Sequence, residues 1–168
     1  MTATMTAAAP LSMTAATTAD YVNPVIAATQ SVFEIMLGCT AKRTGLRLKQ
    51  FPEPQPEVSC VIGISGRAAG TIIVGLPKEV ACSVLERMLG TVTEEVTDEV
   101  CDAIGELTNM IAGAAKAKLA KYELSISLPS VVTGEGCLMH HPKSICPFEI
   151  AFDSDIGPFT IDVAFHVL

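Results

Sequence analysis

Two acids and an amide, Asp102, Glu106 and Asn109, are spaced for one face of a helix. At about 100° per residue, Glu106 lies about 40° from Asp102 and Asn109 about 20° to the other side, so the three side chains form a stripe roughly 60° wide. Carboxylates pair with cations, and a carboxamide both donates and accepts hydrogen bonds. The stripe therefore predicts a surface that pairs with a cation and orients a water molecule. An ordinary solvated helix face is the simpler alternative.

Two glycines accompany this stripe. Gly113 follows Asn109 by one turn on the same face, and Gly105 lies near the edge of that face. A glycine inside a helix costs about 1 kcal/mol relative to alanine. We therefore expect another surface to approach the helix closely at Gly105 and Gly113.

The stripe belongs to a predicted long helix from about Thr97 to Tyr122. Thr97 is a favourable N-cap, and Asp98 and Glu99 complement the helix dipole in the first turn. Apolar residues cluster on the side opposite the stripe, which indicates that this side faces the core. They are Val96, Val100, Ile104, Leu107, Ile111 and Ala114.

Further helices and strands are predicted on both sides of the long helix. Hydrophobic periodicity and turn residues predict helices at 20–37 and 77–89, and strands at 41–48, 58–64, 71–76, 124–129, 145–153 and 159–167. This order suggests a duplicated helix-plus-strands unit, with both long helices on one sheet. Residues 1–19 consist mostly of Ala, Thr and Met and predict a disordered tail, so the domain is expected at 20–168.

The composition limits the classes of partner. The chain has 168 residues, is 49% hydrophobic and carries a net charge of −7 with no strongly basic cluster, so nucleic acid and anionic membranes are poor partners. No apolar run reaches the roughly 18 residues of a membrane-spanning helix. The six cysteines include no Cys-x-x-Cys pair and predict small buried residues in a reducing cytoplasm. Cys137, His140, His141 and Cys146 are spaced too loosely for a typical zinc site, so no metal site is expected.

The segment Glu106–Gly113, preceded by Asp102, resembles the Asp/Ser-x3-Glu-x2-Asn signature of the CheC/CheX/FliY chemotaxis phosphatases. Other segments agree in their order with the CheX branch of that family, and the resemblance runs from about Asp20 to the C-terminus. These segments are Asn23-Pro24, the glycine-rich turn 66–71, Met88-Leu-Gly90 and 128–134. The resemblance and the order of elements together predict an α/β (α+β) fold, an antiparallel sheet of two hairpin-plus-strand halves with two long helices packed on it.

The resemblance implies a phosphatase that acts on an aspartyl-phosphorylated response regulator of the CheY type. In that chemistry Asn109 would position the attacking water, and Glu106 would pair with the receiver's lysine. Asp102 would be an accessory contact at the rim, and Gly105 and Gly113 would admit the partner. Mg²⁺ is expected on the receiver, so the chain needs no cofactor of its own. The alternative is a non-catalytic module that binds the regulator or acts as an adaptor.

Two further expectations concern the number of sites and of subunits. Asp20-Tyr-Val-Asn23 echoes Glu106-Leu-Thr-Asn109, but Pro24 disfavours helical geometry at Asn23, so Asn23 is expected to cap a helix and only one site is expected. The resemblance also implies a homodimer joined through sheet edges. The strands at 58–64, 71–76 and 159–167 support this idea because they are apolar and carry few charges that would protect an edge.

Overall fold

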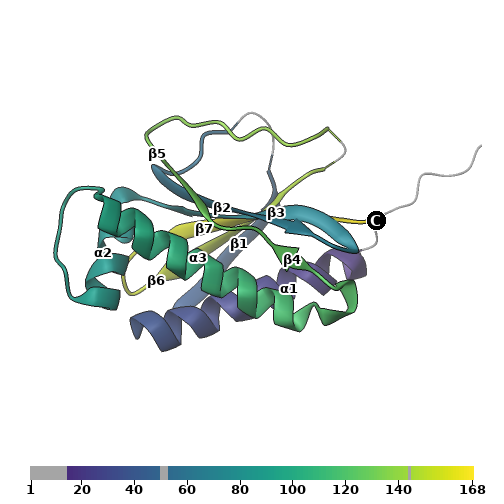
Figure 1. Cartoon of the computed structure of the whole chain (residues 1–168), viewed down its shortest axis with the longest axis horizontal. Coiled ribbons are helices and arrows are strands. Elements are labelled where there is room, and N and C mark those ends of the chain that lie inside the picture. Colours follow the sequence, from purple (N-terminus) through teal and green to yellow (C-terminus); the bar gives the residue numbers. More distant parts are fainter. Residues whose placement is uncertain (1–14, 50–52, 144) are drawn as a thin grey trace, which may run out of the picture.

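The computed structural model describes residues 15–49, 53–143 and 145–168, and the side chains from residue 18 onward (Figure 1). The chain has two similar halves, each with helices followed by a run of strands. In order they are α1 (Ala15–Val32), a π-helical turn (Phe33–Leu37), β1 (Ala41–Leu48), β2 (Val58–Ser65), β3 (Ala68–Leu76), α2 (Lys78–Leu89), α3 (Asp98–Lys118), a 3-10 turn (Ala120–Tyr122), β4 (Ser125–Ile126), β5 (Ser130–Thr133), β6 (Phe148–Ser154) and β7 (Phe159–Val167).

All seven strands join one antiparallel sheet with the order β1-β6-β7-β3-β2-β4, and β5 also pairs with β2. Each strand of the first half has a counterpart in the second half: β1 corresponds to β4 and β5, β2 to β6, and β3 to β7. When every strand is replaced by its counterpart, the strand order is the same but runs from the other edge of the sheet. That is the symmetry a duplicated helix-plus-strands unit predicts. The predicted fold class, an antiparallel sheet of two halves with two long helices on it, is confirmed.

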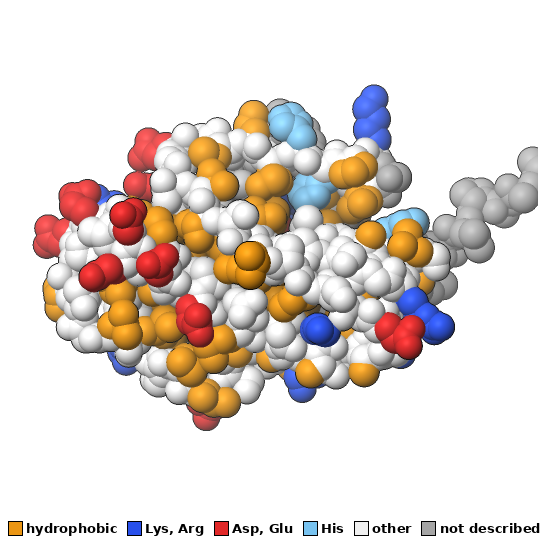
Figure 2. Space-filling model, in the orientation of Figure 1, with side chains coloured by type: hydrophobic (Ala, Val, Ile, Leu, Met, Phe, Trp, Pro, Cys, Tyr) orange, Lys and Arg blue, Asp and Glu red, His pale blue; other side chains and the backbone are white. Residues whose placement is uncertain are grey.

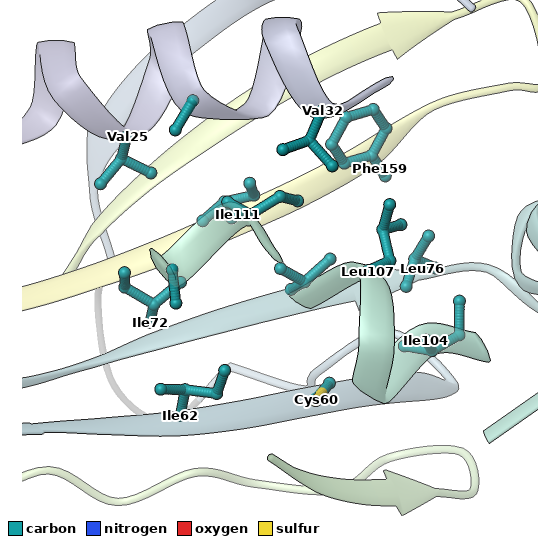
Figure 3. Close-up of a cluster of buried hydrophobic side chains, with 14 of the residues drawn as sticks. Val25, Val32, Cys60, Ile62, Ile72, Leu76, Ile104, Leu107, Ile111 and Phe159 are labelled. Atoms are coloured by element: carbon teal, nitrogen blue, oxygen red, sulfur yellow. The ribbon is translucent and has the colours of Figure 1, made fainter. Parts of the chain in front are cut away.

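Helices α1 and α3 pack side by side on one face of the sheet and enclose the core between themselves and the strands (Figure 1). Alternate residues of each strand point to this face, as the two-residue period of a strand requires. Figure 3 shows side chains from both helices meeting those of three strands. The labelled residues are Val25, Val32, Cys60, Ile62, Ile72, Leu76, Ile104, Leu107, Ile111 and Phe159, and all of them are buried.

The opposite face of the sheet is covered by irregular segments at residues 53–57, 134–143 and 145–147, and the bridge between Pro54 and Leu138 joins the first two of them. Beneath them lies a buried ion pair, in which Lys49 Nζ is 2.6 Å from Asp162 Oδ2. Gln55 donates a hydrogen bond of 3.0 Å from its Nε2 to the same oxygen. This polar cluster holds the covering segments to the sheet, because Gln55 belongs to one of them and Asp162 to β7.

Several predicted boundaries are wrong. Helix α1 begins by Ala15 and continues through Pro24, so residues 15–19 are helical and the predicted tail overlaps the domain; residues 1–14 lie outside the described residues. The predicted strand at 124–129 is reduced to β4, and β5 follows it beyond Pro129. In the described ranges, no helix combines the length and the hydropathy that crossing a bilayer requires.

The strands expected at the sheet edges are internal, so that part of the dimer argument is wrong. β3 and β7 pair with each other at the centre, and β2 is flanked by β3 on one side and by β4 and β5 on the other. Their apolar character reflects burial rather than an unprotected edge. The true edges are β1, which carries the exposed Lys42, Arg43 and Arg47, and the short strands β4 and β5.

The burial pattern of α3 gives a direct test of its orientation. Replacing Leu107 by Ala is expected to lower the free energy of unfolding by about 2–5 kcal/mol, because a fully buried side chain leaves a cavity. Replacing Asp102 by Ala is expected to change it by less than about 0.5 kcal/mol, because Asp102 is exposed. Chemical denaturation of the two variants measures both values, and equal losses would mean that the faces of α3 are assigned wrongly.

Candidate active site

The candidate site lies on α3, whose ends are fixed by local interactions. Thr97 caps the helix, because its side chain accepts a hydrogen bond of 3.3 Å from the backbone N–H of Val100. Asp98 and Glu99 lie in the first turn and Lys116 and Lys118 in the last, which is the charge order that the helix dipole favours. The helix is therefore a rigid support for the side chains along it.

Packing leaves only one arc of α3 open to solvent. The apolar residues Ile104, Leu107 and Ile111 are fully buried, as predicted. Asp102, Glu106 and Asn109 are all exposed, and the helical spacing places them in one stripe. The acids and the amide that the sequence singles out are thus together on an accessible surface.

The two glycines have different surroundings. Gly105 is buried, and a Cβ there would lie 3.6 Å from Pro129 Cγ, so the surface that covers it is the chain's own. Because Gly105 is covered by Pro129, a partner does not reach it on the open face, and the expectation that Gly105 admits a partner is wrong. The distance of 3.6 Å is an ordinary contact that an alanine would also make. At Gly113 a Cβ would have no neighbour within 4 Å. Nothing in the described residues accounts for a glycine at position 113.

Charge is distributed unevenly along this side of the molecule. In Figure 2 most of the acidic side chains gather at the end where α2 meets the start of α3, and more of the basic ones lie toward the other end. The exposed acids at the first end include Glu94, Glu95, Asp98 and Glu99, and the exposed lysines at the other end are Lys116, Lys118 and Lys121. Asp102 and Glu106 extend the acidic half, so a partner surface with positive charge is favoured there.

Cys101, next to Asp102, is not activated as a nucleophile. Its side chain is half-buried. Burial, and then the negative charges of Asp98 and Asp102, raise the pKa of its thiol. A thiol that stays protonated at neutral pH attacks poorly, so Cys101 is not favoured as a nucleophile at this surface.

Helix α1 carries the similar segment Asp20-Tyr-Val-Asn23, but its side chains have different neighbours. Asn23 lies inside α1 and is exposed, so the expectation that it caps the helix is wrong. Asp20 Oδ2 lies 3.6 Å from Lys121 Nζ, so this carboxylate is paired within the chain. Glu106, in contrast, takes part in none of the ion pairs found among the described residues. The difference favours α3 over α1 as the active surface.

The loosely spaced cysteines and histidines do not come together. Cys146 and His140 are exposed, and Cys137 and His141 are half-buried in the segment that covers the far side of the sheet. Across the described ranges, no three His, Cys, Asp or Glu side chains lie close enough to one another to hold a metal ion.

Comparison with known proteins identifies the family. The sequence model described as chemotaxis phosphatase CheX matches residues 58–153, which include α3 and its stripe. The chain belongs to this family. A CheX relative from Thermotoga maritima, named CheY-P phosphatase CheX, is 32% identical over 119 residues, which are 69% of this chain and 77% of the relative.

Solved CheX structures share the architecture. The chemotaxis protein CheX from Vibrio vulnificus superposes with a TM-score of 0.80 at 29% identity, over 88% of this chain and 99% of that one. CheX from Borrelia burgdorferi, solved in complex with CheY, BeF3 and Mg²⁺, superposes with a TM-score of 0.74 over 87% of this chain and 97% of that one. At 23% identity this second likeness concerns the fold.

A substitution at Gly113 tests whether the stability of the free protein requires a glycine at this position. Gly113→Ala is expected to raise the free energy of unfolding of the free protein by about 0.5–1 kcal/mol, because alanine favours the helix and its Cβ meets open space. Gly157→Ala serves as the control and is expected to be destabilising, since Gly157 has a φ of +116° and its Cβ would lie 2.8 Å from Val80. Urea denaturation compares the variants, and a destabilised Gly113→Ala protein would show that the fold itself requires this glycine.

Proposed function

We propose that this protein hydrolyses the aspartyl phosphate of a CheY-type response regulator and uses the exposed stripe on α3 as its active surface. The observation that carries the proposal is that Glu106 and Asn109 lie together on the open arc of a rigid helix. Family membership and the activity named for the Thermotoga relative support the same reaction. The Borrelia complex supports a CheY-type partner.

Asn109 is proposed to hold the attacking water. Phosphoryl transfer requires the nucleophile in line with the phosphorus and the leaving aspartate oxygen. A carboxamide accepts a hydrogen bond from the water through its oxygen and adds no negative charge beside the phosphoryl group. A carboxylate in the same place would repel the phosphoryl oxygens, so an amide is the suitable side chain at position 109.

Glu106 and Asp102 are proposed to bind the receiver. Glu106 lies one turn from Asp102 toward Asn109, where it can pair with the lysine beside the phosphorylated aspartate. Such a pair becomes stronger when the interface excludes water, and it fixes the register of the two proteins. Asp102 is farther from Asn109 and contributes as an exposed charge at the rim.

The divalent ion of the reaction is assigned to the receiver. Mg²⁺ is part of the Borrelia CheX–CheY complex, and we propose that it enters here with the phosphorylated partner. It neutralises charge on the phosphoryl oxygens, while this chain supplies the in-line water and the docking contacts. We also place the protein in the cytoplasm, where the receiver domains that it would dephosphorylate occur and where its free cysteines stay reduced.

Substitutions at Asn109 and Glu106 separate catalysis from binding. Asn109→Ala is expected to slow receiver dephosphorylation at least about 100-fold with little change in affinity, because the amide acts mainly on the water of the transition state. Glu106→Lys is expected to weaken binding at least about tenfold as well, because it places a cation opposite the receiver's lysine. The decay of a phosphorylated CheY-type receiver and the Kd for its beryllofluoride form with Mg²⁺ measure both effects.

Asp20→Ala and Asn23→Ala on α1 are the matched controls and are expected to leave both measurements unchanged. Wild-type activity in Asn109→Ala would rule out the assigned mechanism. Tight binding of the receiver by a wild-type protein that does not accelerate dephosphorylation would establish the alternative, a non-catalytic binding module.

We further propose a homodimer joined through a sheet edge, on the basis of the family resemblance. Helix α3 presents its stripe away from the strands, so each subunit can hold its own receiver. Sedimentation equilibrium at micromolar concentration is expected to give about twice the chain mass of 17.6 kDa. The mass of a single chain, together with full phosphatase activity, would exclude the dimer and leave the role of α3 unchanged.

A further inference from the structure

Leu128 is an exposed apolar residue that neither the core nor the proposed chemistry uses. Its exposed fraction of 87% is the highest among the large hydrophobic residues in the described ranges. Single exposed leucines are common on protein surfaces and carry no information by themselves. The backbone on both sides of Leu128 and its position beside α3 set it apart.

The segment around Leu128 is held firmly. Ser127 donates its backbone N–H to Gly63 O at 2.9 Å, and its hydroxyl accepts a 2.9 Å hydrogen bond from Gly63 N. The same hydroxyl donates to Leu128 O at 2.9 Å. On the other side, Pro129 restricts the backbone and packs 3.6 Å from the position of a Cβ on Gly105. The backbone at Leu128 is thus held by Ser127 on one side and Pro129 on the other, while the side chain of Leu128 points into solvent.

The segment that carries Leu128 connects two contacts with α3, one on each side of the turn that carries Asn109. Gly105, Asn109 and Gly113 occupy successive turns along one side of the helix. Pro129 packs on Gly105, and Ile126 lines the same shallow hollow as Gly113. Residues 127–128 connect these two contacts, and the chain between β4 and β5 runs along α3 (Figure 1).

We propose that Leu128 is an apolar anchor that seats the receiver so that its phosphorylated aspartate faces Asn109; this inference rests on the proposed function. The occupant is an apolar patch of the same receiver domain, beside its phosphorylation site. The contact adjoins the stripe, since Pro129, the neighbour of Leu128, packs on Gly105, which the helical period places on the side of Asn109 away from Glu106. Because the backbone at Leu128 is already held, little backbone entropy is lost on binding, so more of the gain from burying the side chain is kept as affinity.

Leu128 is a positioning residue, and together with Glu106 it sets the orientation of the receiver. Glu106 supplies charge on one side of Asn109, and Leu128 supplies apolar contact on the other. One charged and one apolar contact on opposite sides of the amide fix the rotation of the receiver, which a single ion pair leaves free. The open position at Gly113, one turn further along, leaves room for the receiver surface to lie against the helix.

The test compares Leu128→Ser, Leu128→Met and the control Leu138→Ser in the full chain. Leu138 is also exposed, at 48%, but it lies in the segment on the opposite face of the sheet. The probe is a CheY-type receiver activated with beryllofluoride and Mg²⁺ for the Kd, and the same receiver phosphorylated for kcat and KM. Thermal midpoints are measured for all variants.

Leu128→Ser is expected to raise Kd and KM roughly tenfold to thirtyfold, as loss of an interface anchor does, and to lower kcat as well, because the bound receiver then presents its aspartyl phosphate to Asn109 less precisely; the thermal midpoint is expected to stay unchanged. Leu128→Met is expected to restore Kd to within about threefold, because it keeps the apolar volume. Leu138→Ser is expected to match the wild type.

A Kd for Leu128→Ser within about twofold of wild type, in a protein that dephosphorylates the receiver normally, would overturn the anchor and leave the proposed function standing. A loss of kcat without a change in Kd would also overturn it. Failure of the wild type to bind or dephosphorylate the receiver would overturn the proposed function, and the anchor with it.

Discussion

The packing of α3 against the sheet determines where chemistry can take place on this protein. Fully buried side chains such as Ile104, Leu107 and Ile111 fix the rotation of the helix about its axis, so the residues on the opposite arc must face solvent. A rotation of α3 that hid Glu106 would bring a charge into the core and expose leucine and isoleucine, which costs several kcal/mol. The stripe is therefore held in place by the hydrophobic core and not by contacts of its own.

Because the substrate is itself a folded protein, the site has no need of an enclosed cavity. A flat helix face with one amide and one free carboxylate suffices if the partner brings the phosphoryl group and its metal ion. Catalysis then depends on the orientation of the receiver relative to Asn109, because an in-line water is useful only at the correct angle. In the proposed complex, the uneven charge along α3, the open position at Gly113 and the fixed segment at Leu128 would all act on that orientation, and none of them adds a reactive group.

The sequence predicts the parts of the fold that depend on local patterns. The period of α3, its cap at Thr97 and the ends of β1 at Ala41 and Leu48 are confirmed, as is the exposed stripe. The helical position of Asn23 was missed because tertiary packing of α1 overrides the bias before Pro24. The neighbours of β2 and the cover on Gly105 arise from contacts between distant segments, which spacing along the chain does not encode. Leu128 was missed for the same reason, since only the fold places its segment beside α3.

The most direct measurement is a crystal structure of this protein bound to a CheY-type receiver that carries beryllofluoride and Mg²⁺. Asn109 is expected to reach the fluoride shell on the side opposite the receiver's aspartate, with a water or the amide itself in line and within about 3 Å. Glu106 is expected to pair with the receiver's lysine. A receiver seated on α1 at Asn23, or one whose beryllofluoride lies beyond the reach of Asn109, would contradict the assignment of the active surface to α3.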